Sequence, residues 1–165
     1  MIYRKANLND IFPIRNVLWK TWEATYSSFI PEVDRRKYFD EYYNQEALQK
    51  MCMDSLIENI VVEESDTIVA YLRLAINSEQ ERFYISSFYV LPEFQGKSIG
   101  NELLSLAVQK AKEKSFSAVW VGVMKENIRS VEWYKNRKFQ FVEELPFTMG
   151  KTTVSHLIGC KKIHE

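Results

Sequence analysis

The chain has 165 residues, of which 46% are hydrophobic and 14% aromatic, so we expect one buried core and a single domain over residues 1–165. Its 22 basic residues balance its 22 acidic ones, which excludes a general attraction to nucleic acid or anionic membranes. The two cysteines, Cys52 and Cys160, lack metal-ligand spacing and no apolar run could span a membrane, so we expect a reduced, cytoplasmic protein without a metal, nucleic-acid or membrane partner.

The first half of the chain reads as one strand, three helices and a hairpin. Residues 1–6 are a strand, and Asn7 or Asn9 caps a helix whose apolar stripe is Ile11, Ile14, Leu18, Trp22 and Tyr26. Two shorter helices are predicted over residues 32–43 and 45–56, the second capped by Asn44. Strands follow over residues 59–64 and 67–76, and the Ser65-Asp66 pair between them indicates a hairpin turn.

A turn rich in small residues lies in the second half of the chain. Residues 83–91 are aromatic and β-branched and read as a strand, while apolar residues from Ile99 to Ala111 recur at helical spacing. The turn between them, Gln95 to Gly100, contains two glycines that can adopt positive φ. It also precedes helix amides that lack intrahelical partners, an arrangement that fits a phosphate. From this spacing alone, a tight turn that binds nothing is equally open.

The remaining elements complete a layered arrangement. Residues 118–123 read as a buried strand, Asn127 as the N-cap of a helix over residues 128–137, and residues 140–144 and 152–161 as closing strands. Because a helix connects the fourth and fifth strands, we expect these two to pair in parallel. The sequence therefore predicts a mixed α/β fold.

Two segments together resemble a known family. Residues 94–104 (FQGKSIGNELL) resemble the Q-x-x-G-x-G pyrophosphate loop of the GNAT superfamily of acetyl-CoA-dependent N-acetyltransferases. Residues 127–139 (NIRSVEWYKNRKF) resemble its second signature, N-x-x-[AS]-x-x-[aromatic]-Y-x-x-x-G-F. The ending, residues 147–158, is loosely similar to bacterial polyamine (spermidine/spermine) acetyltransferases. The resemblance implies a GNAT-like, mostly antiparallel sheet with a central parallel pair of splayed strands, flanked by helices.

The resemblance also implies site residues and a co-substrate, acetyl-CoA. Tyr134 would be the general acid near the sulfur of CoA, since a phenol is protonated at neutral pH. No metal is expected. The residues expected to bind acetyl-CoA are Phe88, Tyr89, Val90, Gln95, Gly96, Lys97, Ser98, Ile99, Gly100, Asn101, Asn127, Ser130 and Tyr134.

Three positions depart from the family pattern. Ser98 replaces a glycine, and we expect the turn there to form without positive φ. Lys138 replaces a glycine at a left-handed position after the helix, at a cost of about 1 kcal/mol. Ser86 stands where many members carry a glutamate, and a neutral hydroxyl cannot act as the base. The candidates for that base are Glu23, Glu32, Glu79, Glu81 and His156, and none is assigned.

The resemblance implies an acceptor pocket built by the first two helices and the final strands. The helical region is rich in aromatic side chains (Trp22, Tyr26, Phe29, Tyr38, Tyr42 and Tyr43) with carboxylates interleaved (Glu23, Asp34, Asp40 and Glu41). Such a surface suits an organic cation. We therefore expect direct acetyl transfer in a ternary complex, without a cysteine acyl-enzyme, to a small cationic amine such as a polyamine. A protein N-terminal or lysine acetyltransferase and a non-catalytic acyl-CoA-binding module are the alternatives, and a homodimer is left open.

Overall fold

The computed structural model describes residues 1–164, and seven strands within them form one sheet in the order β1-β2-β3-β4-β5-β7-β6. Neighbouring strands are antiparallel except for β4 and β5, which are parallel. The predicted mixed α/β fold is therefore confirmed. The strands are β1 (Ile2–Lys5), β2 (Ile57–Glu64), β3 (Thr67–Asn77), β4 (Arg82–Val90), β5 (Ala118–Met124), β6 (Gln140–Met149) and β7 (Thr152–Lys162).

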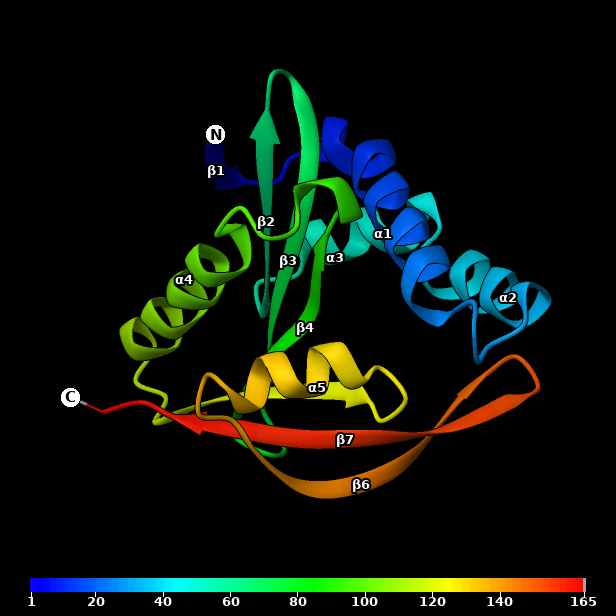
Figure 1. Cartoon of the computed structure of the whole chain (residues 1–165). Coiled ribbons are helices and arrows are strands. Elements are labelled where there is room, and N and C mark those ends of the chain that lie inside the picture. Colours follow the sequence, from blue (N-terminus) through cyan, green and yellow to red (C-terminus); the bar gives the residue numbers. More distant parts are fainter. Residues whose placement is uncertain (165) are drawn as a thin grey trace.

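Helices cover both faces of the sheet. Figure 1 shows α4 on one side of β2, β3 and β4 and α1 on the other, while α5 lies across β5 and β7. Within residues 1–164, no helix is both long and apolar enough to cross a membrane. The α-helices are α1 (Ile11–Tyr26), α2 (Glu32–Tyr42), α3 (Gln45–Met53), α4 (Ile99–Glu113) and α5 (Ile128–Lys135), and single 3-10 turns cover Leu8–Asp10 and Pro92–Phe94.

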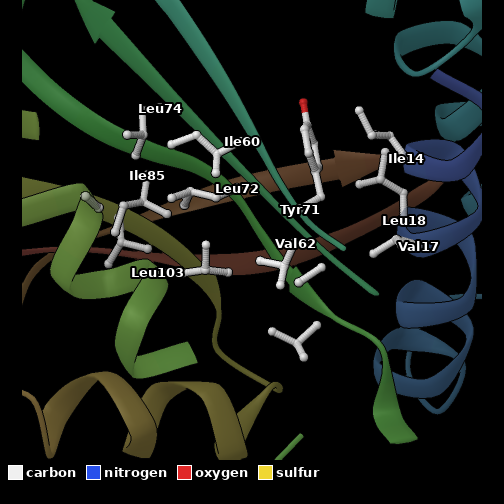
Figure 2. Close-up of a cluster of buried hydrophobic side chains, with 14 of the residues drawn as sticks. Ile14, Val17, Leu18, Ile60, Val62, Tyr71, Leu72, Leu74, Ile85 and Leu103 are labelled. Atoms are coloured by element: carbon white, nitrogen blue, oxygen red, sulfur yellow. The ribbon is translucent and has the colours of Figure 1, made fainter. Parts of the chain in front are cut away.

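The core has two halves, one on each face of β3. Figure 2 shows Ile14 and Leu18 of α1 facing Tyr71, and Leu103 of α4 on the side of Leu72. Leu18, Tyr71, Leu72 and Leu103 are all completely buried. Because successive side chains of a strand point to opposite faces, Arg73 lies on the α1 face with Tyr71.

Side-chain caps and turns explain several element boundaries. Asn7 caps the first helical turn, and the side chain of Asn44 accepts a hydrogen bond of 2.9 Å from the Ala47 amide. Ser65 and Asp66 have φ of 48° and 61°, which confirms the predicted hairpin turn. These boundaries were predictable because each depends on a local hydrogen bond or on one favoured backbone conformation.

Two predicted boundaries are wrong by three residues or more, while the predicted start of β2 and end of α5 each differ by two. The third helix ends at Met53 and not at residue 56, because Asp54 is extended and its side chain accepts a hydrogen bond from the Leu56 amide. The strand predicted over residues 140–144 continues to Met149, through Pro146. Pro146 is tolerated there because β6 is the edge strand of the sheet.

The parallel pair opens soon after it forms. β4 and β5 pair only where Phe83, Tyr84 and Ile85 face Val119, Trp120 and Val121, although β4 continues to Val90 and β5 to Met124. Against β3, Arg73 lies opposite Ser87 and Leu74 opposite Ile85, so Ser86 is the extra residue of a bulge. The splay implied by the resemblance is thus present.

Asp34 fastens α2 to the turn between β6 and β7, where the two elements also lie side by side in Figure 1. Its carboxylate accepts hydrogen bonds from the Lys151 amide (2.9 Å) and the Thr152 hydroxyl (2.5 Å). Gly150 has a φ of 61°, and a Cβ there would collide with Asp34. The hydrogen bonds from Thr152 and Lys151 hold the pKa of Asp34 below its ordinary value.

We predict that Asp34→Ala lowers Tm by a few degrees at neutral pH, because two donors lose their carboxylate acceptor. A carboxyl group with a lowered pKa stabilises the fold above its unfolded pKa of about 4, and that stabilisation is lost as pH falls below it. The difference in Tm between wild type and variant should therefore shrink in acid. Asp40→Ala is the matched control, because Asp40 is exposed and makes one loose ion pair at 3.9 Å. Equal shifts from both substitutions would contradict the prediction.

Candidate functional site

A cavity of about 980 Å³ is lined by β4 and β5 beyond their paired residues. Residues of α1, α2, β3, α5, β6, β7 and the turn before α4 complete its wall. Eleven of the predicted site residues line it: Phe88, Tyr89, Val90, Gln95, Gly96, Ser98, Gly100, Asn101, Asn127, Ser130 and Tyr134. The fold therefore brings both sequence motifs to one hollow.

The turn before α4 has the backbone that an anion site needs. Gly96 has a φ of 78°, and nothing lies within 4 Å of the position of a Cβ there. Ser98 has a φ of 67°, so our expectation of a turn without positive φ at this residue is wrong. Ser98 begins α4, and its left-handed conformation costs on the order of 1 kcal/mol relative to glycine.

Three other residues of this turn have structural roles. The side-chain amide of Gln95 donates a hydrogen bond of 3.0 Å to the carbonyl of Val90 and so fastens the turn to β4. Lys97 and Ile99 are not among the lining residues. The ammonium of Lys97 lies 4.6 Å from the centre of the Phe94 ring, and Ile99 is buried in the core with 1% exposure. Only the backbone amide of Ile99 is left to contact a ligand.

Helix α5 belongs to the second motif and forms part of the cavity wall. Asn127 caps it through a 3.3 Å hydrogen bond from the Ser130 amide, and Lys138 after it has a φ of 70°, both as predicted. Arg137 was missed by the sequence analysis. Its guanidinium donates to Asn101 at 2.8 Å and lies 3.8 Å from the Trp133 ring centre, so it joins the two motifs beside the cavity.

Tyr134 is 5% exposed and lines the cavity. Its ring makes edge contacts with Trp133 (5.1 Å between centroids) and Phe139 (5.0 Å). Burial raises the pKa of the Tyr134 phenol well above its ordinary value of 10. The hydroxyl is therefore protonated at neutral pH, which a proton donor requires.

His156 is the single base candidate of the five that lines the cavity. It lies opposite Met124 of β5, its ring is 5.1 Å from that of Phe147, and a Cβ on Gly122 would lie 2.6 Å from its Cε1. Burial lowers the pKa of His156, so the imidazole is neutral near pH 7. Glu23, Glu32, Glu79 and Glu81 are exposed and outside the lining.

The aromatic side chains and the carboxylates of the first helices separate in space. Trp22, Tyr26, Tyr38 and Tyr43 line the cavity, whereas Phe29 and Tyr42 do not. The carboxylates expected beside them, Glu23, Asp34, Asp40 and Glu41, are all outside the lining. The sequence missed this separation because residues that alternate along a helix point to different faces.

Ser86 and Arg73 form a pair on the wall of the cavity. The Ser86 hydroxyl accepts a hydrogen bond of 3.0 Å from Arg73 and donates one of 3.2 Å to the Arg73 carbonyl. Arg73 itself was missed by the sequence analysis. The available signal was its position as the one charged residue in an otherwise apolar strand, residues 67–77 (TIVAYLRLAIN).

Comparisons with known proteins agree with this geometry. The model of the acetyltransferase (GNAT) family matches residues 14–139. An uncharacterized N-acetyltransferase in the pepI 3′ region of Lactobacillus delbrueckii subsp. lactis is 27% identical over 89 residues, 50% of this chain and 51% of that protein. A spermine/spermidine N(1)-acetyltransferase of Bacillus subtilis strain 168 is 26% identical over 82 residues, 49% of this chain and 54% of that protein. The chain thus spans about half the length of these curated relatives.

Among solved structures, the crystal structure of PaiA N-acetyltransferase from Thermoplasma acidophilum in complex with coenzyme A has a TM-score of 0.86 and 22% identity, covering 98% of both chains. This likeness shows a shared fold over the whole length of the two chains.

We predict that CoA raises the Tm of the wild type and that Gly100→Glu removes this rise. Gly100 lines the cavity, and a Cβ there would lie 3.2 Å from the Trp133 ring, so a glutamate adds both bulk and negative charge where a phosphate would bind. Ser105→Glu is the control, since it places the same charge on the exposed face of α4. An undiminished CoA response in a folded Gly100→Glu variant would remove this turn from the binding site.

Proposed function

Because the chain belongs to the GNAT acetyltransferase family, we propose that it is a single acetyltransferase domain that moves the acetyl group of acetyl-CoA directly to the nitrogen of a small primary amine. One observation carries the proposal. The opening between β4 and β5 joins a glycine-containing turn at the start of a helix, a protonated phenol and a neutral imidazole in one cavity. Acetyl transfer to an amine needs a site for the phosphates of CoA, a proton donor and a proton acceptor.

The residues around the turn before α4 fit the phosphates of CoA. Gly96 has open space beside its backbone, and the first amides of the 15-residue helix α4 have no intrahelical partner. Arg137 adds a positive charge beside this turn. The edge of β4 from Ser86 to Val90 has no strand partner on the β5 side, so the amides that point away from β3 are available to the pantetheine arm and to the thioester oxygen as that oxygen gains charge.

Tyr134 is the proposed proton donor. Its hydroxyl is buried at the cavity wall and keeps its proton at neutral pH, so it is suited to protonate the departing thiolate. His156 is the proposed general base, which would take a proton from the nitrogen of the amine substrate. Its imidazole is neutral near pH 7, and a base must be unprotonated to act. Ser86 has no such role, because its hydroxyl is held by Arg73.

Direct transfer is favoured over an acyl-enzyme. An acyl-enzyme needs a nucleophile such as a thiolate in the site. Cys52 lies on α3 and Cys160 on β7, and neither is among the lining residues.

The acceptor is proposed to be small because the cavity wall that faces it is aromatic and built by α1, α2 and β6. The relative in Bacillus subtilis is described as a spermine/spermidine acetyltransferase, which supports the prediction of a polyamine. The expected carboxylates do not support it, since none of them lines the cavity. A protein N-terminus or lysine remains the second kind of acceptor, and a non-catalytic acyl-CoA-binding module the alternative from another class.

The test of the proposed function measures release of the CoA thiol from acetyl-CoA with a panel of small amines, in wild type and in Tyr134→Phe. The variant keeps the ring contacts with Trp133 and Phe139 but loses the proton donor, so kcat should fall by about 10² with little change in CoA affinity. The fall should be smaller for an acyl donor whose thiol is more acidic. Tyr42→Phe is the control, since Tyr42 is exposed and outside the lining.

Three results would contradict parts of this proposal. Wild-type turnover in Tyr134→Phe would make the residue a packing group. Substrates restricted to peptides with free N-termini would favour the protein acetyltransferase. Binding of CoA without thiol release for any amine would favour the binding module.

We predict a pH effect that depends on His156. The pKa of His156 lies below the ordinary value of 6.5, so the imidazole is neutral above that pH and becomes protonated as pH falls through its pKa. In wild type, kcat should therefore decrease as pH falls through the pKa of His156, which gives the pH profile an acid limb. His156→Gln should lose this acid limb and have a kcat lower by roughly 10² at pH 8. His164→Gln, at the other histidine, which is exposed, should behave as wild type. An unchanged acid limb in His156→Gln would assign the base to another group or to water.

A further inference from the structure

Arg73 is a buried cation on the wall of the cavity. It is 9% exposed and lies on the α1 face of β3, opposite Ser87 of β4. Moving a guanidinium out of water costs free energy unless an anion or several hydrogen bonds compensate for the lost hydration. The partners of Arg73 therefore show whether its charge is compensated within the protein.

The protein partners of Arg73 are all neutral. Its guanidinium donates to the Ser86 hydroxyl (3.0 Å), the Met51 sulfur (2.7 Å) and the Tyr43 hydroxyl (3.4 Å). Within residues 1–164, no carboxylate lies within ion-pair distance of it. A guanidinium has five N–H groups, so these three bonds leave one N–H without a protein acceptor on each terminal nitrogen, and a guanidinium can bind a carboxylate through two N–H groups.

The phenols around Arg73 do not supply the missing charge. Burial raises the pKa of Tyr38 to about 12 and raises those of Tyr71 and Tyr89 above their ordinary value of 10, so these three phenols are neutral at physiological pH. The one carboxylate among the lining residues, Glu126, lies next to Asn127 at the start of α5, on the side of the second motif.

Two further donors of the same wall have no acceptor. The Trp22 indole nitrogen and the Ser87 hydroxyl are buried, belong to residues that line the cavity, and have no hydrogen-bond partner within residues 1–164. The Tyr43 ring connects Trp22 to Arg73, since its centre is 5.3 Å from the Trp22 ring and 5.4 Å from the guanidinium carbon of Arg73. Buried donors without acceptors are rare in folded proteins, and two of the four such atoms in residues 1–164 are on this wall, while the other two belong to Arg35 outside the cavity.

We propose that the amine acceptor carries a carboxylate, as an amino acid does, and that Arg73 binds this carboxylate with help from Trp22 and Ser87. The inference rests on the proposed acetyl transfer and narrows its substrate class. A carboxylate would supply the acceptor atoms that these donors lack, and its negative charge would compensate the buried guanidinium. A polyamine would bring only further positive charge to Arg73, and like charges repel strongly at a buried site.

The experiment compares pairs of acceptors that differ only in the carboxylate: lysine with cadaverine, ornithine with putrescine, and phenylalanine with phenethylamine. Thiol release from acetyl-CoA gives kcat/KM for each. In wild type, the member of each pair with the carboxylate should be preferred by about tenfold or more. Arg73→Gln should remove most of that preference through a higher KM for the acid, and should not lower kcat/KM of the decarboxylated amine, because the substitution removes a repelling charge.

Two further variants separate binding from folding. Arg73→Lys keeps the charge but not the fork, so it should retain part of the preference and covers the case in which Arg73→Gln fails to fold. Arg15→Gln is the matched control. Arg15 is a partly buried arginine that donates to the Tyr43 carbonyl at 2.9 Å but does not line the cavity, so its loss should leave the preference intact.

The remaining outcomes distinguish a failure of the carboxylate site from a failure of the proposed acetyl transfer. If wild type prefers cadaverine, putrescine or spermidine, or if Arg73→Gln lowers both members of a pair equally, the carboxylate site is wrong while acetyl transfer stands. If no amine is acetylated, the proposed acetyl transfer is wrong. The carboxylate site is then tested by the effect of each ligand on Tm. A rise in Tm with the amino acids but not with their decarboxylated partners, lost in Arg73→Gln, supports it, and no such rise overturns it.

Discussion

The separation of β4 from β5 beyond Ile85 and Val121 is the constraint on which the site depends. Each strand keeps its outer neighbour along its length: β4 pairs with β3 as far as Val90, and β5 pairs with β7 as far as Met124. The extra residue Ser86 bends β4 away, because a bulge increases the local twist of a strand. Of the edges of these two strands, only the inner ones are left unpaired, and residues along both line the cavity.

The same opening determines which side chains can act together. Tyr134 follows β5 on helix α5, while His156 lies on β7 opposite the end of β5. Gly122 gives the imidazole of His156 its space on β5, since a Cβ there would collide with the ring. A proposed proton donor and a proposed proton acceptor therefore reach one cavity from opposite sides of a single strand.

Charge in the cavity differs from charge in the whole chain. The sequence is neutral, with 22 basic and 22 acidic residues, yet the lining contains three arginines (Arg73, Arg129 and Arg137) and one carboxylate (Glu126). Buried and partly buried charges are screened less than exposed ones, so this local excess acts on a ligand even though the net charge is zero.

The sequence by itself determined what depends on neighbouring residues. It determined the caps at Asn44 and Asn127, the left-handed Lys138, the order of strands and helices, and both family motifs, because each rests on local hydrogen bonds or on the period of apolar residues. The end of α3, the length of β6 and the positive φ of Ser98 were wrong, because an Asp54 turn, an edge position in the sheet and the entry into α4 prevailed over local preference. Only the tertiary structure decided that the carboxylates of α1 and α2 lie outside the cavity, that His156 lies inside it, and that no carboxylate of residues 1–164 pairs with Arg73. These depend on which face of each element meets the opening between β4 and β5, and that opening arises from pairing between strands far apart in the chain.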